Sequence, residues 1–145
     1  MIQVTKIFRF EMAHAIHQYP GNCKHVHGHS YQLHVTVAAP LNDDTYLPNP
    51  GYAIDFKALK HWVQSSVLNY LDHATVLSKA YIADNNVQLQ QERLQVWEAE
   101  PTAENMLVYI RHQLEQIIPP NVSVTKLVLY ETQDSYAEWL PSVRN

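Results

Sequence analysis

Two stretches near the N-terminus alternate between apolar and polar residues, which is the period of a half-buried β-strand. The first runs from about Ile2 to Ala13, and its apolar face carries Val4, Phe8, Phe10 and Met12. The second runs from about His29 to Ala39, and its apolar face carries Tyr31, Leu33, Val35 and Val37. The pattern therefore predicts two neighbouring strands, joined by a loop over roughly residues 16 to 26.

Two later segments carry apolar residues at helical spacing. The first begins at Asp55, a predicted N-cap, ends near Leu71 to His73, and has a buried stripe of Phe56, Leu59, Val63, Val67 and Leu71. The second begins after Pro101, with Thr102 as its N-cap and acidic Glu104 in its first turn. Its stripe is Met106, Leu107, Ile110, Leu114, Ile117 and Ile118, and Pro119 and Pro120 stop it.

The remaining segments complete an α+β pattern. Residues 40–51 are rich in Pro, Asn and Asp and predict a loop, and residues 81–100 predict a long loop with a short helix. Alternation from Val122 to Glu131 and from Tyr136 to Leu140 predicts two more strands. The order strand-strand-helix-helix-strand-strand predicts an antiparallel sheet with helices on one face, in a single domain over residues 1–145.

Composition narrows the class of protein. A chain of 145 residues with 46% hydrophobic residues is long enough to bury a core. The formal net charge is −4 and no run of Lys or Arg occurs, so we expect no nucleic-acid surface, although a local basic pocket for a phosphorylated ligand is compatible. One cysteine permits no internal disulfide. Neither a signal-peptide pattern nor a membrane-spanning run occurs, so we expect a soluble, cytoplasmic protein without a membrane partner.

Three histidines fall in matching strand phase. His27 and His29 are two residues apart, so their imidazoles leave the second strand on one face. His14 shares the parity of the apolar face of the first strand, and an antiparallel hairpin would bring it beside them. Three imidazoles without a carboxylate or a second thiolate favour zinc with an open fourth position, although copper, nickel or iron could occupy the same ligands. The alternative is a polar histidine-rich turn, or one histidine satisfied in the core.

Other residues carry candidate chemistry. Cys23 lies beside Lys24 and His25, whose positive charge would favour a reactive thiolate, and a structural free cysteine is the alternative. Asp72 and His73 put a carboxylate next to an imidazole at a predicted helix end. Adjacent residues on a helix diverge, so the two form a relay only if the helix has already ended, or if they address a third group. The alternative is that both residues lie on the surface and have no functional role.

Glu131 is the last candidate. It shares the parity of the apolar residues Leu127 and Leu129, and a buried carboxylate needs a partner. A ligand that presents two parallel N–H donors, as a guanidine-like heterocycle edge does, would satisfy it. The alternative is a solvated glutamate beyond the core.

Six motifs in this order resemble the family of 6-pyruvoyl tetrahydropterin synthases and 6-carboxytetrahydropterin synthases. They are Phe10-Glu11-Met12-Ala13-His14, Cys23-x-x-x-His27-Gly28-His29-Ser30-Tyr31, Ile54-Asp55-Phe56 with Leu59-Lys60, Leu71-Asp72-His73, Pro101-Thr102-x-Glu104-Asn105 and Tyr130-Glu131-Thr132. The resemblance spans about residues 8 to 132. Two features depart from it: Ala15 stands where many members carry Arg, and the stretch from Ser78 to Glu100 is longer than in the family pattern.

The resemblance implies a tunnelling fold, in which three subunits pool their sheets into a barrel and two such rings stack as a homohexamer with active sites between subunits. It implies zinc ligands at His14, His27 and His29. It further implies a proton-abstracting thiolate at Cys23 and a relay formed by Asp72 and His73. Glu131 matches the carboxylate that anchors the pterin ring, also described as part of the relay, and Thr102 and Thr132 fall in segments that line this pocket.

The implied reaction starts from 7,8-dihydroneopterin triphosphate, with zinc as Lewis acid. In the carboxy-forming branch, which belongs to the queuosine (7-deazaguanine) pathway, a carbon–carbon bond of the substrate side chain breaks, and acetaldehyde and triphosphate leave. In the pyruvoyl branch only triphosphate leaves. The gap of three residues between Cys23 and His27 resembles the carboxy-forming enzymes, so we expect a carbon-carbon lyase of that branch. A zinc hydrolase and a non-catalytic pterin- or metal-binding relative are the alternatives, and the thiol and the relay argue against them.

Overall fold

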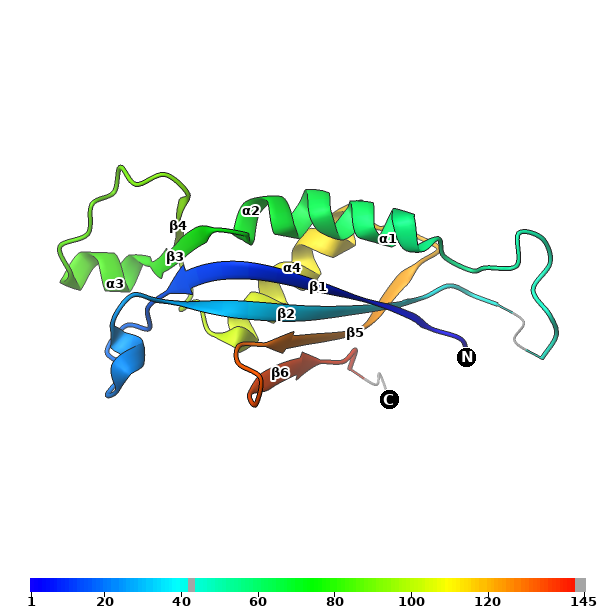
Figure 1. Ribbon diagram of the computed structural model, residues 1–145, viewed down its shortest axis with the longest axis horizontal. Helices are drawn as coiled ribbons and strands as arrows, with labels where there is room; N and C mark the ends of the chain where they lie inside the picture. Colours follow the sequence, from blue (N-terminus) through cyan, green and yellow to red (C-terminus); the bar gives the residue numbers. More distant parts are fainter. Residues whose placement is uncertain (42–43, 143–145) are drawn as a thin grey trace.

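A twisted sheet runs along the molecule (Figure 1). The computed structural model describes residues 1–41 and 44–142. In chain order its elements are β1 (Val4–His14), the 3₁₀ turn η1 (Asn22–Lys24), β2 (His27–Ala38), α1 (Phe56–Val63), the π-helical turn η2 (Gln64–Leu68), α2 (Asn69–Leu71), β3 (Ala74–Ser78), α3 (Lys79–Asp84), β4 (Leu94–Trp97), α4 (Ala103–Ile117), β5 (Ser123–Tyr130) and β6 (Tyr136–Trp139). The strands lie side by side in the order β4-β3-β1-β2-β5-β6.

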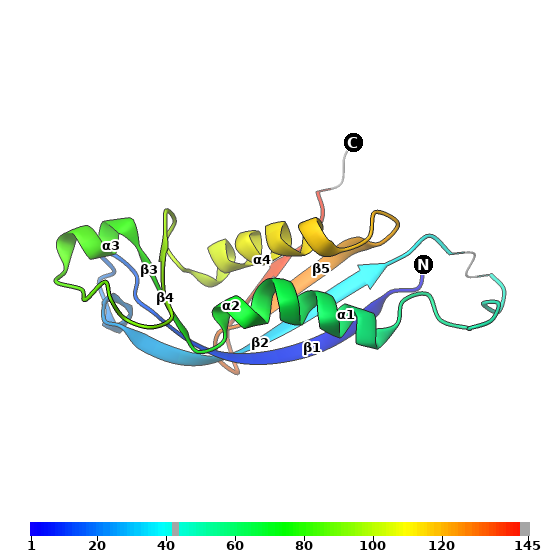
Figure 2. The same ribbon diagram turned by 90° about the horizontal axis from the view of Figure 1, so that it is seen from above.

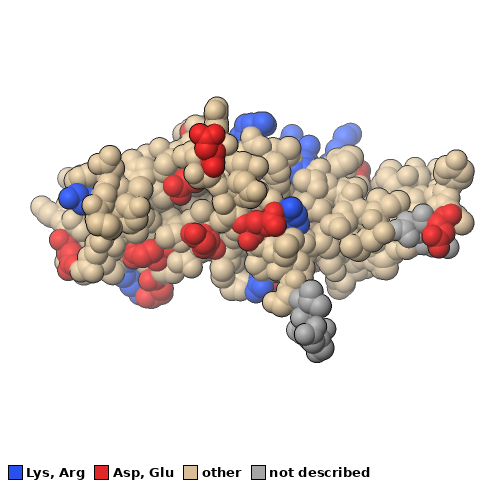
Figure 3. All heavy atoms as spheres, turned by 90° about the horizontal axis from the view of Figure 1, so that it is seen from below, with Lys and Arg blue, Asp and Glu red and all other residues tan. Residues whose placement is uncertain are grey.

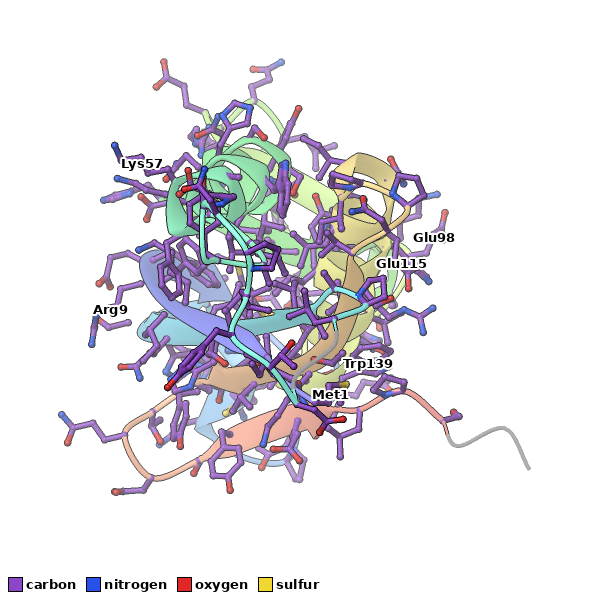
Figure 4. All side chains as sticks on the ribbon, turned by 90° about the vertical axis from the view of Figure 1, so that its right-hand side faces the viewer. Met1, Arg9, Lys57, Glu98, Glu115 and Trp139 are labelled. Atoms are coloured by element: carbon purple, nitrogen blue, oxygen red, sulfur yellow. The ribbon has the colours of Figure 1, made fainter. Side chains whose placement is uncertain are left out.

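The long helices cover one face of the sheet (Figure 2), as predicted. Strand alternation places Phe8, Phe10 and Leu33 on this face, where they pack against Leu59 of α1 and Ile110 of α4 in one hydrophobic core. The other face is polar, and Arg9 points away from the helices in Figure 4. The two faces of β1 and β2 therefore differ as the sequence pattern predicts.

β1 and β2 pair along their whole lengths as an antiparallel hairpin. His14 lies opposite His27, and Met12 lies opposite His29. Because side chains alternate between faces, this register puts all three imidazoles on the helix-covered side at one end of the sheet. The structure thus confirms the predicted hairpin.

The sheet is mixed rather than antiparallel, and this corrects the predicted topology. β3 runs parallel to β1, and β4 runs parallel to β3. The sequence predicts only a helix end here, followed by a long loop with a short helix over residues 81–100. The helix end is found, and α3 corresponds to the short helix but begins two residues before that range. β3 and β4 are short, with five and four residues, and the strands that they pair with lie far away in the sequence. Local pattern carries no signal for such pairing.

The other predicted elements are found close to their expected bounds. β5 and β6 pair as an antiparallel hairpin, and the helical rod of α1, η2 and α2 ends at Leu71. No helix in the described part of the protein is long and apolar enough to cross a membrane. On the face shown in Figure 3, the Lys and Arg residues are scattered among acidic side chains. The fold is α+β, as expected.

The N-cap of α1 provides a first test of the fold. The Asp55 carboxylate accepts the Lys57 N–H at 2.8 Å, as the sequence predicts. An Asp55→Ala variant is expected to lose about 1 kcal/mol of unfolding free energy. This loss corresponds to a melting temperature lower by about 3 °C, measured by calorimetry. Asp55→Ser, which keeps an oxygen acceptor, is the matched control and should melt near wild type; equal melting of Asp55→Ala and wild type would contradict the cap.

Candidate metal centre

Three imidazoles converge at the end of the β1–β2 hairpin. His14, His27 and His29 each offer a nitrogen, and these atoms lie within 4.8 Å of one another. The Nε2 atoms of His14 and His27 are 3.1 Å apart. Two nitrogens on one tetrahedral zinc lie about 3.3 Å apart, because each Zn–N bond measures about 2.0 Å. The His14–His27 pair therefore has the spacing of two ligands on one zinc ion, and the His29 nitrogen lies within 4.8 Å of both, so the group could hold a metal ion.

Two backbone carbonyls orient the rings. His14 Nδ1 lies 2.7 Å from the Pro101 carbonyl oxygen, and His27 Nδ1 lies 2.6 Å from the His25 carbonyl oxygen. A carbonyl can only accept, so Nδ1 donates in both rings and Nε2 keeps its lone pair. Pro101 directly precedes Thr102, the N-cap of α4, so the start of this helix supports the position of His14.

Burial favours the neutral, metal-binding form of His14 and His29. His14 is only 1% exposed, and this burial lowers its pKa, with the Pro101 hydrogen bond and the Glu131 charge opposing part of the effect. Burial also lowers the pKa of His29, again opposed by the charge of Glu131. Neutral imidazoles present lone pairs at pH 7, which a metal ion requires.

Two buried polar atoms at the site lack a hydrogen-bond partner among the described residues: His29 Nε2 and the Tyr31 hydroxyl. The Glu131 carboxylate lies 3.5 Å from His29 Nε2, which is too long for a good hydrogen bond. Burial, followed by the charges of Glu131 and Cys23, raises the pKa of Tyr31, so its hydroxyl stays protonated. An unpaired buried nitrogen is costly, and a bound cation would satisfy it. The donor set therefore fits zinc.

A cavity of about 360 Å³ opens beside the histidines. Its lining includes four predicted site residues, namely His14, Cys23, Thr102 and Glu131. Cavities of this size hold small-molecule ligands in many proteins. The Cys23 thiol, the Glu131 carboxylate and one of the three histidines, His14, therefore line the same cavity.

Short loops position the thiol and the carboxylate. Cys23 is half-buried on η1, where its carbonyl accepts the Ile16 N–H at 2.7 Å. Glu131 follows the last residue of β5, and its N–H donates to the Ser135 carbonyl at 3.0 Å. Its side chain is 26% exposed, so it is neither buried in the core nor fully solvated. Thr132 lies exposed in the β5–β6 turn, outside the cavity lining.

Asp72 and His73 form a direct pair. The helix has ended at Leu71, and His73 adopts a left-handed backbone with φ of 62°, so its ring returns toward the preceding carboxylate. The Nδ1 of His73 lies 2.9 Å from the Asp72 carboxylate, which also accepts the Glu11 N–H at 2.9 Å. His73 lines a different hollow from Cys23, together with Glu11, Ser30 and His29.

Sequence reasoning missed several groups at the site. Tyr19 and Tyr136 line the cavity, and the Pro101 carbonyl orients a proposed ligand. A backbone carbonyl has no sequence signal. Tyr136 had a weak sequence signal, because it is the first residue of β6 and pairs with Tyr130, the residue before Glu131.

Fold and site together define an α+β protein with a group of three histidines that could hold a metal ion, beside a small-molecule cavity. A sequence model of the family 6-pyruvoyl tetrahydropterin synthase matches residues 3–141. The protein belongs to this family.

Named relatives are similar over nearly the whole sequence. The 6-carboxy-5,6,7,8-tetrahydropterin synthase of Rickettsia typhi is 30% identical, and the match covers 95% of this protein and 99% of that one. The protein of the same name from Haemophilus influenzae is 27% identical, and the match covers 96% and 99%. The solved structure of Caenorhabditis elegans 6-pyruvoyl tetrahydropterin synthase superposes with a TM-score of 0.69 at 21% identity, over 97% of this protein and 96% of that one. This last likeness concerns the fold alone.

Proposed function

We propose that this protein is a zinc-dependent 6-carboxytetrahydropterin synthase. It converts 7,8-dihydroneopterin triphosphate and one water molecule to 6-carboxytetrahydropterin, acetaldehyde and triphosphate. The observation that carries the proposal is that Cys23, Glu131 and His14 line one cavity, and that His14 belongs to the group of three histidines. A zinc hydrolase would not need the thiol, and a pterin-binding relative would not need the pair of Asp72 and His73.

Two observations favour the carboxy-forming branch, which serves queuosine (7-deazaguanine) biosynthesis. Three residues separate Cys23 from His27, the gap that resembles the carboxy-forming enzymes. The relatives from Rickettsia typhi and Haemophilus influenzae carry the name of that branch.

Each cavity residue has a role in the proposed reaction. Zinc held by His14, His27 and His29 would supply Lewis acidity toward the hydroxyls of the substrate side chain. Glu131 accepts two parallel N–H bonds from the pterin edge and thereby fixes the ring in the cavity. Cys23, as a thiolate, takes a proton from the substrate side chain.

The two threonines contribute to substrate binding. The Thr102 oxygen accepts the Asn105 N–H at 3.3 Å, and its own O–H stays available to a ligand in the cavity. Thr132 follows Glu131 and closes the turn through its oxygen, which accepts the Asp134 N–H at 3.3 Å. Thr132 thus supports the loop that presents the anchoring carboxylate.

A second copy of the protein supplies the proton-returning group. Within one subunit, Cys23 and His73 line different hollows, and the His73 side chain is 75% exposed. In a homohexamer of two stacked trimeric barrels, Asp72 and His73 of one subunit would face the Cys23 cavity of the next. β4 and β6 form the two edges of the sheet among the described strands, which leaves backbone groups for pairing between subunits. Light scattering should give a mass six times that of one subunit.

The function is tested by incubating the purified protein with zinc and 7,8-dihydroneopterin triphosphate. Acetaldehyde and 6-carboxytetrahydropterin should form in equal amounts, and prior chelation should abolish both. Triphosphate release with a pyruvoyl product and no acetaldehyde would assign the protein to the pyruvoyl branch. Absence of turnover in the zinc-loaded protein would contradict the proposal.

Mixing two inactive variants tests the shared site. Cys23→Ala and His73→Gln should each be inactive alone. After subunit exchange in equal amounts, about a quarter of the sites should hold an intact Cys23 from one subunit and an intact His73 from its neighbour. Acetaldehyde release should recover to about that fraction of wild type. If both residues acted within one subunit, mixing would restore nothing.

A further inference from the structure

Side chains from the start of β4 hold the turn that carries Asp72 and His73. β4 pairs with β3, which begins directly after this turn (Figure 1). Arg93 Nη2 donates to the Asp72 carbonyl at 2.6 Å and to the Asn69 carbonyl at 3.1 Å. Gln95 donates to the Tyr70 carbonyl. Carbonyls at a helix C-terminus lack partners within the helix and attract cations, so Arg93 completes the end of α2.

The peptide group between Asp72 and His73 is held at both polar ends. Arg93 donates to the carbonyl oxygen of this peptide, which belongs to Asp72. The N–H of the same peptide, which belongs to His73, donates to the Glu11 carbonyl on β1 at 2.6 Å. This peptide plane determines where the His73 side chain leaves the backbone. A loss of either contact would therefore redirect the imidazole.

Two unfavourable backbone conformations meet at this point. His73 has φ of 62° and Arg93 has φ of 64°, in the left-handed region that residues with a Cβ rarely adopt. The Arg93 carbonyl accepts the Thr75 N–H at 3.0 Å, which ties the two segments together. Such conformations persist where the surroundings hold them, and they cluster at functional sites.

Packing does little to orient the His73 ring. Its side chain is 75% exposed, and that of Asp72 is 41% exposed. The backbone contacts of the turn and the Asp72 carboxylate are what fix its direction. Arg93 is itself exposed, so a direct role in phosphate binding is the competing explanation.

We infer that Arg93 is a positioning residue for His73. Its guanidinium holds the Asp72–His73 peptide in the orientation from which the imidazole returns a proton to the substrate. This inference rests on the proposed function, in which His73 is the proton donor.

An Arg93→Met variant tests the inference by kinetics. It removes the guanidinium and keeps an unbranched stem. The kcat for acetaldehyde release should fall about tenfold with KM unchanged, because proton-transfer geometry changes while the pterin cavity does not. Arg93→Lys, which restores one donor, should recover part of kcat. A raised KM with wild-type kcat would assign Arg93 to phosphate binding and overturn the inference.

Lys79→Met is the matched control. Lys79 is another exposed cation next to β4, but it pairs with Glu98 and has no contact with the Asp72–His73 turn among the described hydrogen bonds and ion pairs. This variant should keep wild-type kcat and KM. An equal loss of kcat in Lys79→Met would show a general effect of destabilising this edge of the sheet and would overturn the specific role of Arg93.

A second readout does not depend on turnover. In protein with isotope-labelled histidine, the His73 amide signal is assigned from its absence in His73→Gln. Arg93→Met should accelerate hydrogen exchange at this amide and leave zinc content unchanged, whereas unchanged exchange would overturn the inference. If the wild-type protein fails to turn over the pterin triphosphate, the proposed function fails. The rate of hydrogen exchange at the His73 amide then shows by itself whether Arg93 holds the turn.

Discussion

A His27→Ala variant is expected to bind zinc more than about 100-fold less tightly than wild type. Loss of a hydrogen-bond partner behind a zinc ligand already costs about 10- to 100-fold, and this variant removes a ligand itself. His27 is the best ligand to replace, because it is only partly buried at the start of β2, whereas His14 is 1% exposed. The protein should therefore still fold. Zinc content after dialysis, measured by atomic absorption, checks the prediction.

His25→Ala is the matched control for the zinc measurement. The His25 side chain is exposed, and only its backbone carbonyl contacts the His27 ring. Alanine keeps that carbonyl, so zinc content should match wild type. Undiminished zinc in His27→Ala, with melting behaviour intact, would refute a metal centre built on these histidines.

A Cys23→Ala variant is expected to lose about a thousandfold in kcat while it keeps its zinc. General acid–base groups contribute about 10²- to 10⁴-fold to enzymatic rates, and Cys23 is the thiol in the proposed cavity. The residue lies on the short turn η1 and is only half-buried, so its truncation should leave the core intact. The measurement is acetaldehyde release under saturating substrate, with zinc content determined on the same sample.

Cys23→Ser separates the thiol chemistry from the space that the side chain fills. A hydroxyl is nearly isosteric with a thiol but is a far weaker acid, so it supplies almost no anion at neutral pH. The serine variant should therefore be nearly as slow as the alanine variant. Full turnover by Cys23→Ala would remove the thiolate from the mechanism and leave the histidine group as the sole candidate centre.

The two large predicted effects concern different parts of one site. If His27→Ala loses both zinc and turnover while Cys23→Ala loses only turnover, metal binding and proton transfer are separable functions of the cavity. Such a result would match the geometry, because the Cys23 thiol is not among the three grouped ligands.

The sequence by itself determined the hairpin and the convergence of the histidines. The strand period of two places His27 and His29 on one face, and the parity of β1 adds His14 to it. The N-caps Asp55 and Thr102 were equally predictable, because the cap and its backbone partner lie within a few residues of each other. Local order along the sequence was sufficient for these features.

Only the tertiary structure decided how the distant segments meet. The parallel pairing of β3 with β1 brings the Asp72–His73 turn against Glu11, and the left-handed backbone of His73 turns its ring onto the Asp72 carboxylate. The hydrogen bond from His14 to the Pro101 carbonyl likewise joins β1 to the start of α4. These contacts link residues far apart in the sequence, or depend on one backbone angle, and neither leaves a periodic signal. Burial of apolar surface and pairing of backbone groups stabilise these contacts, and both arise only once the sheet has assembled.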